Sequence, residues 1–202
     1  MVTLLDDAAA ERIRQAIEAA ERATAGELRV VLVARAARPD LLAGALVALL
    51  ASVPAFVIAA RRAWGVLLVQ DLLWAGGIAF ALGALAAWLL PRLMLERSVA
   101  RRAAEEFERL GIARTAGRTG VLLLLAAAEH RAVLLADRAI DERVPAGTWD
   151  GIVGALVGDL RAGRAAEGVP RALEEIGRRL AEHFPRQEGD MNELPDALER
   201  RP

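Results

Sequence analysis

The residues best suited to chemistry lie just after two apolar runs, at 121–126 and 132–136. Asp137 follows the second run directly, and Asp141, Glu142 and Asp150 come soon after it. Side chains at the ends of strands in α/β sheets commonly line clefts, and carboxylate oxygens are the ligands that Ca²⁺ or Mg²⁺ prefers. The alternative interpretation is structural, with Asp137 capping the following turn and the other acids forming a solvated surface.

A phosphoryl-transfer site is a second possibility in the same region. Arg114 and Arg118 lie in the glycine-rich loop 111–120 and could bind a phosphate, with Asp137 as the nucleophile. The loop lacks the Gly-Lys-Ser/Thr ending of a nucleotide P-loop. Arginines in such a loop are more often ordinary surface charges, and that is the alternative interpretation.

Composition excludes several other mechanisms. The chain has no Cys and no Tyr, only two Ser, at positions 52 and 98, and only two His, at positions 130 and 183. Thiolate catalysis, disulfides and soft-metal sites are therefore excluded, and two distant histidines give no zinc signature. The net charge of −1 gives no overall field to attract nucleic acid.

Two long uncharged stretches predict a membrane hairpin. Residues 41–60 and 72–90 are each long enough to cross about 30 Å of hydrocarbon. Arg61 and Arg62 separate them, and Trp74 and Trp88 stand where interfacial aromatic residues are found. A pair of helices buried in a soluble core is the alternative.

The elements on either side of the hairpin predict one divided α/β domain. We expect a helix over 6–25 and a strand over 27–35 before the hairpin. After it we expect a helix up to Gly111, a β-hairpin over 121–136 that could instead be helical, and helices over 148–162 and 168–183. A single short strand does not fold alone, so the strands should share one sheet. The predicted divisions are 1–38 and 92–185 for the α/β domain, 39–91 for the hairpin, and 186–202 for a polar tail that is extended or disordered.

The arginines that flank the spans predict the orientation. Arg35 and Arg38 precede the hairpin, and Arg92, Arg97, Arg101 and Arg102 follow it, whereas the connecting loop has Arg61 and Arg62. The positive-inside tendency then places the α/β domain in the cytoplasm. We therefore expect a two-span protein of the inner (plasma) membrane.

Two segments carry a resemblance to a known family. The stretches "ERIRQAIEAAERATAGELRVVLV" and "TAGRTGVLLLLAAAEHRAVLLADRAI", with Trp149 and "HFPRQEGDMNELPD", resemble the TPM-domain family. The resemblance covers residues 7–38 and 98–196. It implies a small Rossmann-like sandwich, with divalent-metal binding and acid phosphatase activity in some members and the assembly or repair of membrane complexes in others.

The chain departs from the family at one place. Members have Gly-Asp-x-Gly after the second strand of the hairpin, where this chain has Ala136-Asp137-Arg138-Ala139. If the loop needs a positive φ there, alanine is disfavoured, which weakens the case for a metal or phosphate site. We therefore expect a membrane-tethered module that binds other membrane proteins and the lipid bilayer. The alternative is a phosphatase that uses Ca²⁺ or Mg²⁺ held by Asp137, Asp141 and Asp150.

Overall fold

Segments before and after the predicted hairpin form one α/β unit. The computed structural model describes residues 5–36, 96–115, 117–186 and 198–201, together with Gly77, Ala81 and Leu85. Residues 1–36 and 98–202 form one compact unit, and residues 37–97 form another. The predicted spans lie outside the described residues, apart from those three helical positions. Within the part that is described, no helix has the length and apolar character needed to cross a bilayer.

A four-stranded mixed sheet forms the centre of the first unit. Its order is β3-β2-β1-β4, with β1 at Glu27–Val33, β2 at Gly120–Ala126, β3 at Arg131–Ala136 and β4 at Glu199–Arg201. β1 runs parallel to both β2 and β4, whereas β2 and β3 are antiparallel. The mixed sheet flanked by helices confirms the α/β part of the predicted fold class. β4 was not predicted, because its sequence Glu-Arg-Arg has no apolar pattern.

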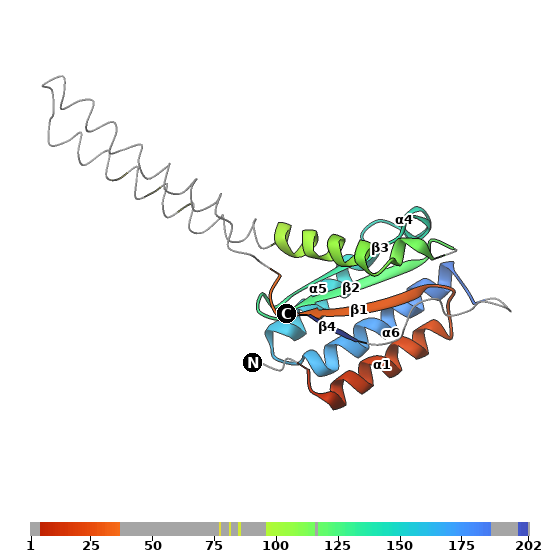
Figure 1. Cartoon of the computed structure of the whole chain (residues 1–202), viewed down its shortest axis with the longest axis horizontal. Helices are drawn as coiled ribbons and strands as arrows, with labels where there is room; N and C mark the ends of the chain where they lie inside the picture. Colours follow the sequence, from red (N-terminus) through yellow and green to blue (C-terminus); the bar gives the residue numbers. More distant parts are fainter. Residues whose placement is uncertain are drawn as a thin grey trace, which may run out of the picture. The chain divides into compact units, whose positions relative to one another are not determined.

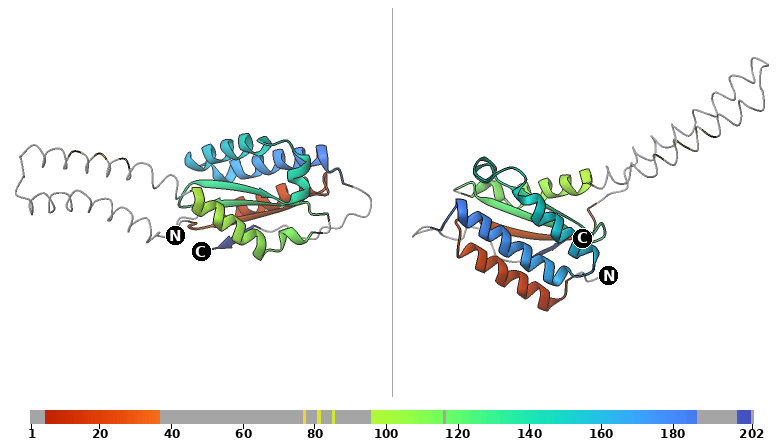
Figure 2. Two further views of the ribbon diagram at one scale, coloured as in Figure 1. Left: turned by 90° about the horizontal axis from the view of Figure 1, so that it is seen from above. Right: turned by 180° about the vertical axis from the view of Figure 1, so that it is seen from behind.

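Helices cover both faces of this sheet (Figures 1 and 2). On one face lie α1 (Asp7–Glu21), α5 (Thr148–Arg161) and α6 (Ala165–His183), with the short α4 (Arg138–Arg143) beside them. The other face is covered by helical residues 96–109, through Val99 and Ala103. Thr148 is the first residue of α5 and does not cap it. The N-cap is Gly147, at φ 83°, and the Thr148 hydroxyl donates to the carbonyl oxygen of Pro145 at 2.7 Å.

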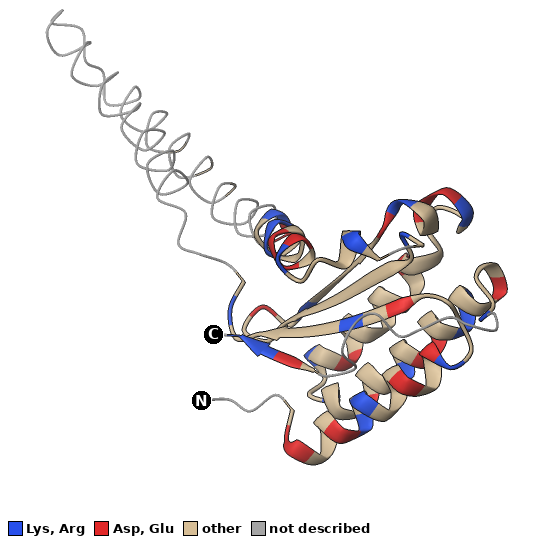
Figure 3. Cartoon of the chain, turned by 45° about the vertical axis from the view of Figure 1, so that its right-hand side comes forward, with Lys and Arg blue, Asp and Glu red and all other residues tan. Residues whose placement is uncertain are grey.

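The two faces of the sheet form two separate apolar clusters. Leu28, Leu123 and Leu125 pack toward α1, α5 and α6, whereas Val33 and Leu124 pack toward helical residues 96–109. All seven residues of β2 are buried, as expected for a central strand covered on both sides. Charged side chains lie mainly on the helices, and β2 has none (Figure 3). Charges at the ends and edges of the sheet are therefore the candidates for function.

Candidate functional site

The glycine-rich loop packs tightly against the start of β2. It contains the 3₁₀ turn Ile112–Arg114 and ends at Gly120. A Cβ on Gly120 would lie 2.4 Å from the Cγ2 atom and 2.6 Å from the carbonyl oxygen of Ile112, so only glycine fits. The backbone N–H of Asp137 donates to the carbonyl oxygen of Gly120 at 2.8 Å. This contact fixes Asp137 beside the loop, at the end of β3.

The carboxylate of Asp137 is buried and only partly satisfied. The residue is 6% exposed and caps α4, with its Oδ1 atom accepting from the backbone N–H of Arg138 at 2.7 Å. Arg118 Nη1 lies 3.7 Å from the same oxygen. The Oδ2 atom is buried without a hydrogen-bond partner. Unsatisfied buried oxygens are uncommon and require an explanation, such as a strained site or a ligand.

Both predicted phosphate-binding arginines belong to the glycine-rich loop, and we call Asp137 with the neighbouring Arg118 the Asp137 corner. Arg118 has a left-handed backbone, at φ 54°, and its Nη1 donates to the carbonyl oxygen of Ala113 at 2.9 Å. A non-glycine residue held there is strained, and such residues cluster at functional sites. Arg114 closes the 3₁₀ turn and is exposed. Of the two arginines, Arg118 lies beside Asp137 with its side chain 57% exposed, and Arg114 lies exposed in the same loop.

The three predicted metal ligands do not come together. Asp141 lies in the first turn of α4 and Asp150 in the first turn of α5, and both are exposed whereas Asp137 is buried. Across the ranges that the structure describes, no three His, Asp or Glu side chains are placed to hold a metal ion. Asp137 already caps a helix and faces an arginine. These residues do not fit a Ca²⁺ or Mg²⁺ site of the kind expected.

An ion-pair network lies at the opposite edge of the sheet, where β4 meets β1. Arg29 on β1 is 4% exposed, and its Nη2 lies 2.6 Å from Glu199 Oε1. Glu199 Oε2 lies 3.0 Å from Arg109 Nη2 and 2.8 Å from Arg201 Nη2. Arg109 is itself held by the buried Glu106. We call Arg29, Arg109 and Glu199, with Arg201, the edge network.

The edge network should make attachment of β4 depend on pH. Burial alone would raise the pKa of Glu199. Hydrogen bonds from Arg109 and Arg201 and the charges of Arg29 and Arg201 outweigh it and lower that pKa below its ordinary value. A carboxyl whose pKa is lowered by folding contributes stability above its unfolded pKa, near 4.5, and loses it as the pH falls through the folded value. We therefore expect a Glu199→Gln chain to be less stable than the native chain at pH 7.

The difference in stability between the native and Glu199→Gln chains should shrink steadily as the pH falls below about 4.5. Unfolding curves of both chains, recorded between pH 7 and pH 3, test this expectation. A stability difference that stays constant across this range would show that the Glu199 charge does not hold β4.

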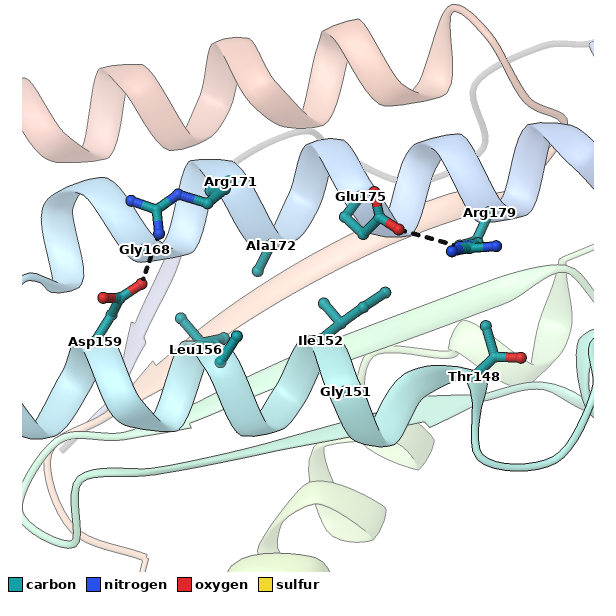
Figure 4. Close-up of a pocket in the computed structure, with 11 residues that line it drawn as sticks. Thr148, Gly151, Ile152, Leu156, Asp159, Gly168, Arg171, Ala172, Glu175 and Arg179 are labelled. Carbon is teal, nitrogen blue, oxygen red and sulfur yellow. Dashed lines mark hydrogen bonds and ion pairs between the residues drawn. The ribbon is translucent and has the colours of Figure 1, made fainter.

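A hollow of about 520 Å³ lies between α5 and α6 (Figure 4). Its floor is formed by Ile152, Leu156 and Ala172, and charged side chains lie around it. The charges are largely paired with one another: Asp159 with Arg164 at 2.8 Å and Arg171 at 3.2 Å, and Glu175 with Arg179 at 3.1 Å. The hollow is therefore an apolar depression between paired charges.

The edge network and Asp159 were not predicted from the sequence. Glu199 stands in a polar tail, where nothing in the local pattern marks it. Arg29 did carry a signal, because it interrupts the apolar run "LRVVLV", and a charge buried in a strand requires an opposite charge. Asp159 carried a weaker signal, as a carboxylate that follows a long apolar run in the same helix. In both cases the partner could be found only in the folded chain.

Comparison with known proteins agrees with this fold. The family model described as the TPM domain matches residues 85–179. The NMR structure of the BA42 protein from the psychrophilic bacterium Bizionia argentinensis has a similar fold. Its TM-score is 0.63, with 21% identity over 97% of this chain and 94% of that one. No curated protein matches the chain. The family match therefore places a TPM domain at residues 85–179, and the fold that the chain shares with BA42 agrees with it.

Proposed function

We propose that this chain is a membrane-tethered TPM domain that binds other membrane proteins and takes part in their assembly or maintenance. The observation that carries the proposal is the position of the two uncharged stretches. They lie between Ala36 and the helical residues 96–109. Val33 and Ala36, on one side of the insertion, share an apolar cluster with Val99 and Ala103 on the other. A chain that leaves and re-enters one domain must cross a bilayer an even number of times, as a hairpin does.

Extraction of membranes at alkaline pH tests the tether. We expect the full chain to stay in the pellet after carbonate treatment. An arginine near the centre of a span costs about 2.5–3.5 kcal/mol for insertion, so the double variant Ala51→Arg and Ala81→Arg should move to the supernatant. The control variant Ala51→Val and Ala81→Val should stay in the pellet. A native chain that carbonate releases would contradict the proposal.

The domain is further proposed to face the cytoplasm, in agreement with the arginines that flank the spans. The native chain has no Cys, so Arg161→Cys introduces a single thiol on an exposed position at the end of α5. An impermeant thiol reagent should label it in broken cells and leave it unlabelled in intact cells. Equal labelling in both would place the domain outside.

A second candidate function is the hydrolysis of phosphomonoesters at the Asp137 corner. The observation that favours it is the buried Oδ2 atom without a partner, beside Arg118. An arginine could bind the phosphate while the carboxylate acts as a nucleophile or a proton acceptor. The name of the matching family model, TPM phosphatase, points the same way.

A generic phosphomonoester tests this candidate, with and without added Ca²⁺ or Mg²⁺. If the corner is an active site, Asp137→Asn should abolish hydrolysis and Arg118→Ala should mainly raise KM. Asp150→Asn is the matched control, because that carboxylate is exposed on α5 and should leave hydrolysis unchanged. Activity that survives Asp137→Asn would remove this candidate and leave the binding module.

A further inference from the structure

The C-terminal strand β4 is a small addition to the sheet. It has three residues, which lie opposite Val31, Leu32 and Val33 of β1, and none of the three is buried. Beyond this register the backbone N–H of Ala34 donates to the carbonyl oxygen of Arg201 at 2.9 Å. Each backbone hydrogen bond contributes about 0.5–1.5 kcal/mol net. Three paired residues alone therefore hold the strand weakly.

The groups that receive β4 belong to the rest of the domain. Arg29 is fixed on β1 and buried, and Arg109 is fixed on the helical segment by Glu106. Both guanidinium groups meet the single carboxylate of Glu199, at 2.6 Å and 3.0 Å. Charge-assisted pairs of this kind are stronger than neutral hydrogen bonds. The domain thus presents two guanidinium groups, and the segment that occupies the site is extended and bears the one carboxylate that both contact.

The adjoining part of the same strand is closed to pairing. The backbone N–H of Leu28 donates to Oε1 of the buried Glu21 at 2.8 Å. A side chain that takes an edge N–H in this way blocks the addition of a strand at that point. Pairing is therefore open over Val31–Ala34, where β4 lies.

We infer that the edge of β1 at Val31–Ala34 is an acceptor site for an extended, carboxylate-bearing segment of a partner polypeptide, and that β4 is the chain's own occupant of this site. Addition of a strand to a sheet edge is a common way to bind peptides, with the main chain giving affinity and side chains giving specificity. The partner's carboxylate would take the place of Glu199 between Arg29 and Arg109. This inference deepens the proposed function, because it names the binding mode of the module, and it rests on that function for the role of the partner.

Competition between β4 and a free peptide tests the inference on the full chain in detergent. The probe is a fluorescent peptide of sequence DALERRP, which copies residues 196–202. The Glu199→Ala chain should bind it at least tenfold more tightly than the native chain, because its own strand has lost both ion pairs. A probe with alanine in place of Glu199 should bind at least tenfold more weakly to the variant chain. The control is Arg200→Ala, since Arg200 is exposed and has contacts no shorter than 3.4 Å to residues 5–7.

Hydrogen exchange of the Ala34 amide gives an independent readout of the same site. Exchange should be faster in Glu199→Ala than in the native chain, and the native probe should slow it again. Equal probe affinity for the two chains, or equal binding of the alanine probe, would overturn the inference. A native dimer whose Ala34 amide loses protection on dilution would also overturn it, because the occupant would then be β4 of a second copy. None of these outcomes depends on carbonate extraction, so failure here leaves the membrane tether standing.

Discussion

Replacing Gly177 by alanine should lower the free energy of unfolding by about 1–3 kcal/mol, the usual cost of overpacking a tight interior. Gly177 lies on α6 where that helix packs against α1. A Cβ at this position would lie 2.5 Å from the Cβ atom and 3.0 Å from the Cα atom of Ala20. Neither atom can move without shifting the α1 backbone, so the two helices would have to separate along their whole contact.

The matched control is Gly154→Ala on the exposed face of α5. No heavy atom lies within 4 Å of a Cβ built there. Because glycine is about 0.8–1 kcal/mol less favourable than alanine inside a helix, this variant should be more stable than the native chain. Denaturant unfolding of both variants, followed by helical circular dichroism, gives the comparison. Equal stability of the two variants would mean that α1 and α6 are not in close contact at Gly177.

The strands that could be predicted were those with an apolar pattern. The runs "VVLV", "VLLLL" and "AVLLA" carry their own signal, and all three form strands of one mixed sheet. β4 could not be found in this way, since Glu199, Arg200 and Arg201 have low intrinsic strand preference. Their extended form depends on the β1 edge and on Arg29, which lie 170 residues earlier in the chain.

The candidate site was predictable in its local part only. Asp137 lies at the end of its strand, as expected, because strand ends can be located from the end of an apolar run. Asp141 follows it by one helical turn, but the turn that starts at Asp137 directs Asp141 to solvent. Whether Asp150 approaches them depends on how α4 and α5 pack, and spacing along the chain contains no information about that packing.

The central and outer strands of the sheet should respond very differently to the same substitution. Leu123 on β2 and Leu134 on β3 are direct cross-strand partners. Leu123 is fully buried, whereas Leu134 is only partly buried at the outer strand. Loss of a fully buried leucine side chain costs about 2–5 kcal/mol, because it removes apolar contacts and leaves a cavity. We therefore expect Leu123→Ala to lower the free energy of unfolding by about 2–5 kcal/mol.

Leu134→Ala should lower the free energy of unfolding much less, because part of that side chain already contacts water in the folded chain. The unfolding midpoints of the two variants, each compared with that of the native protein, give the ratio of the two losses of stability. The two leucines occur in nearly identical apolar runs, so a large ratio would come from their positions in the sheet rather than from their local sequence. Losses of equal size would instead show that β3 is covered in the folded protein as well as β2. The β3 side of the sheet, rather than the β1 edge, would then be the surface on which a partner lies.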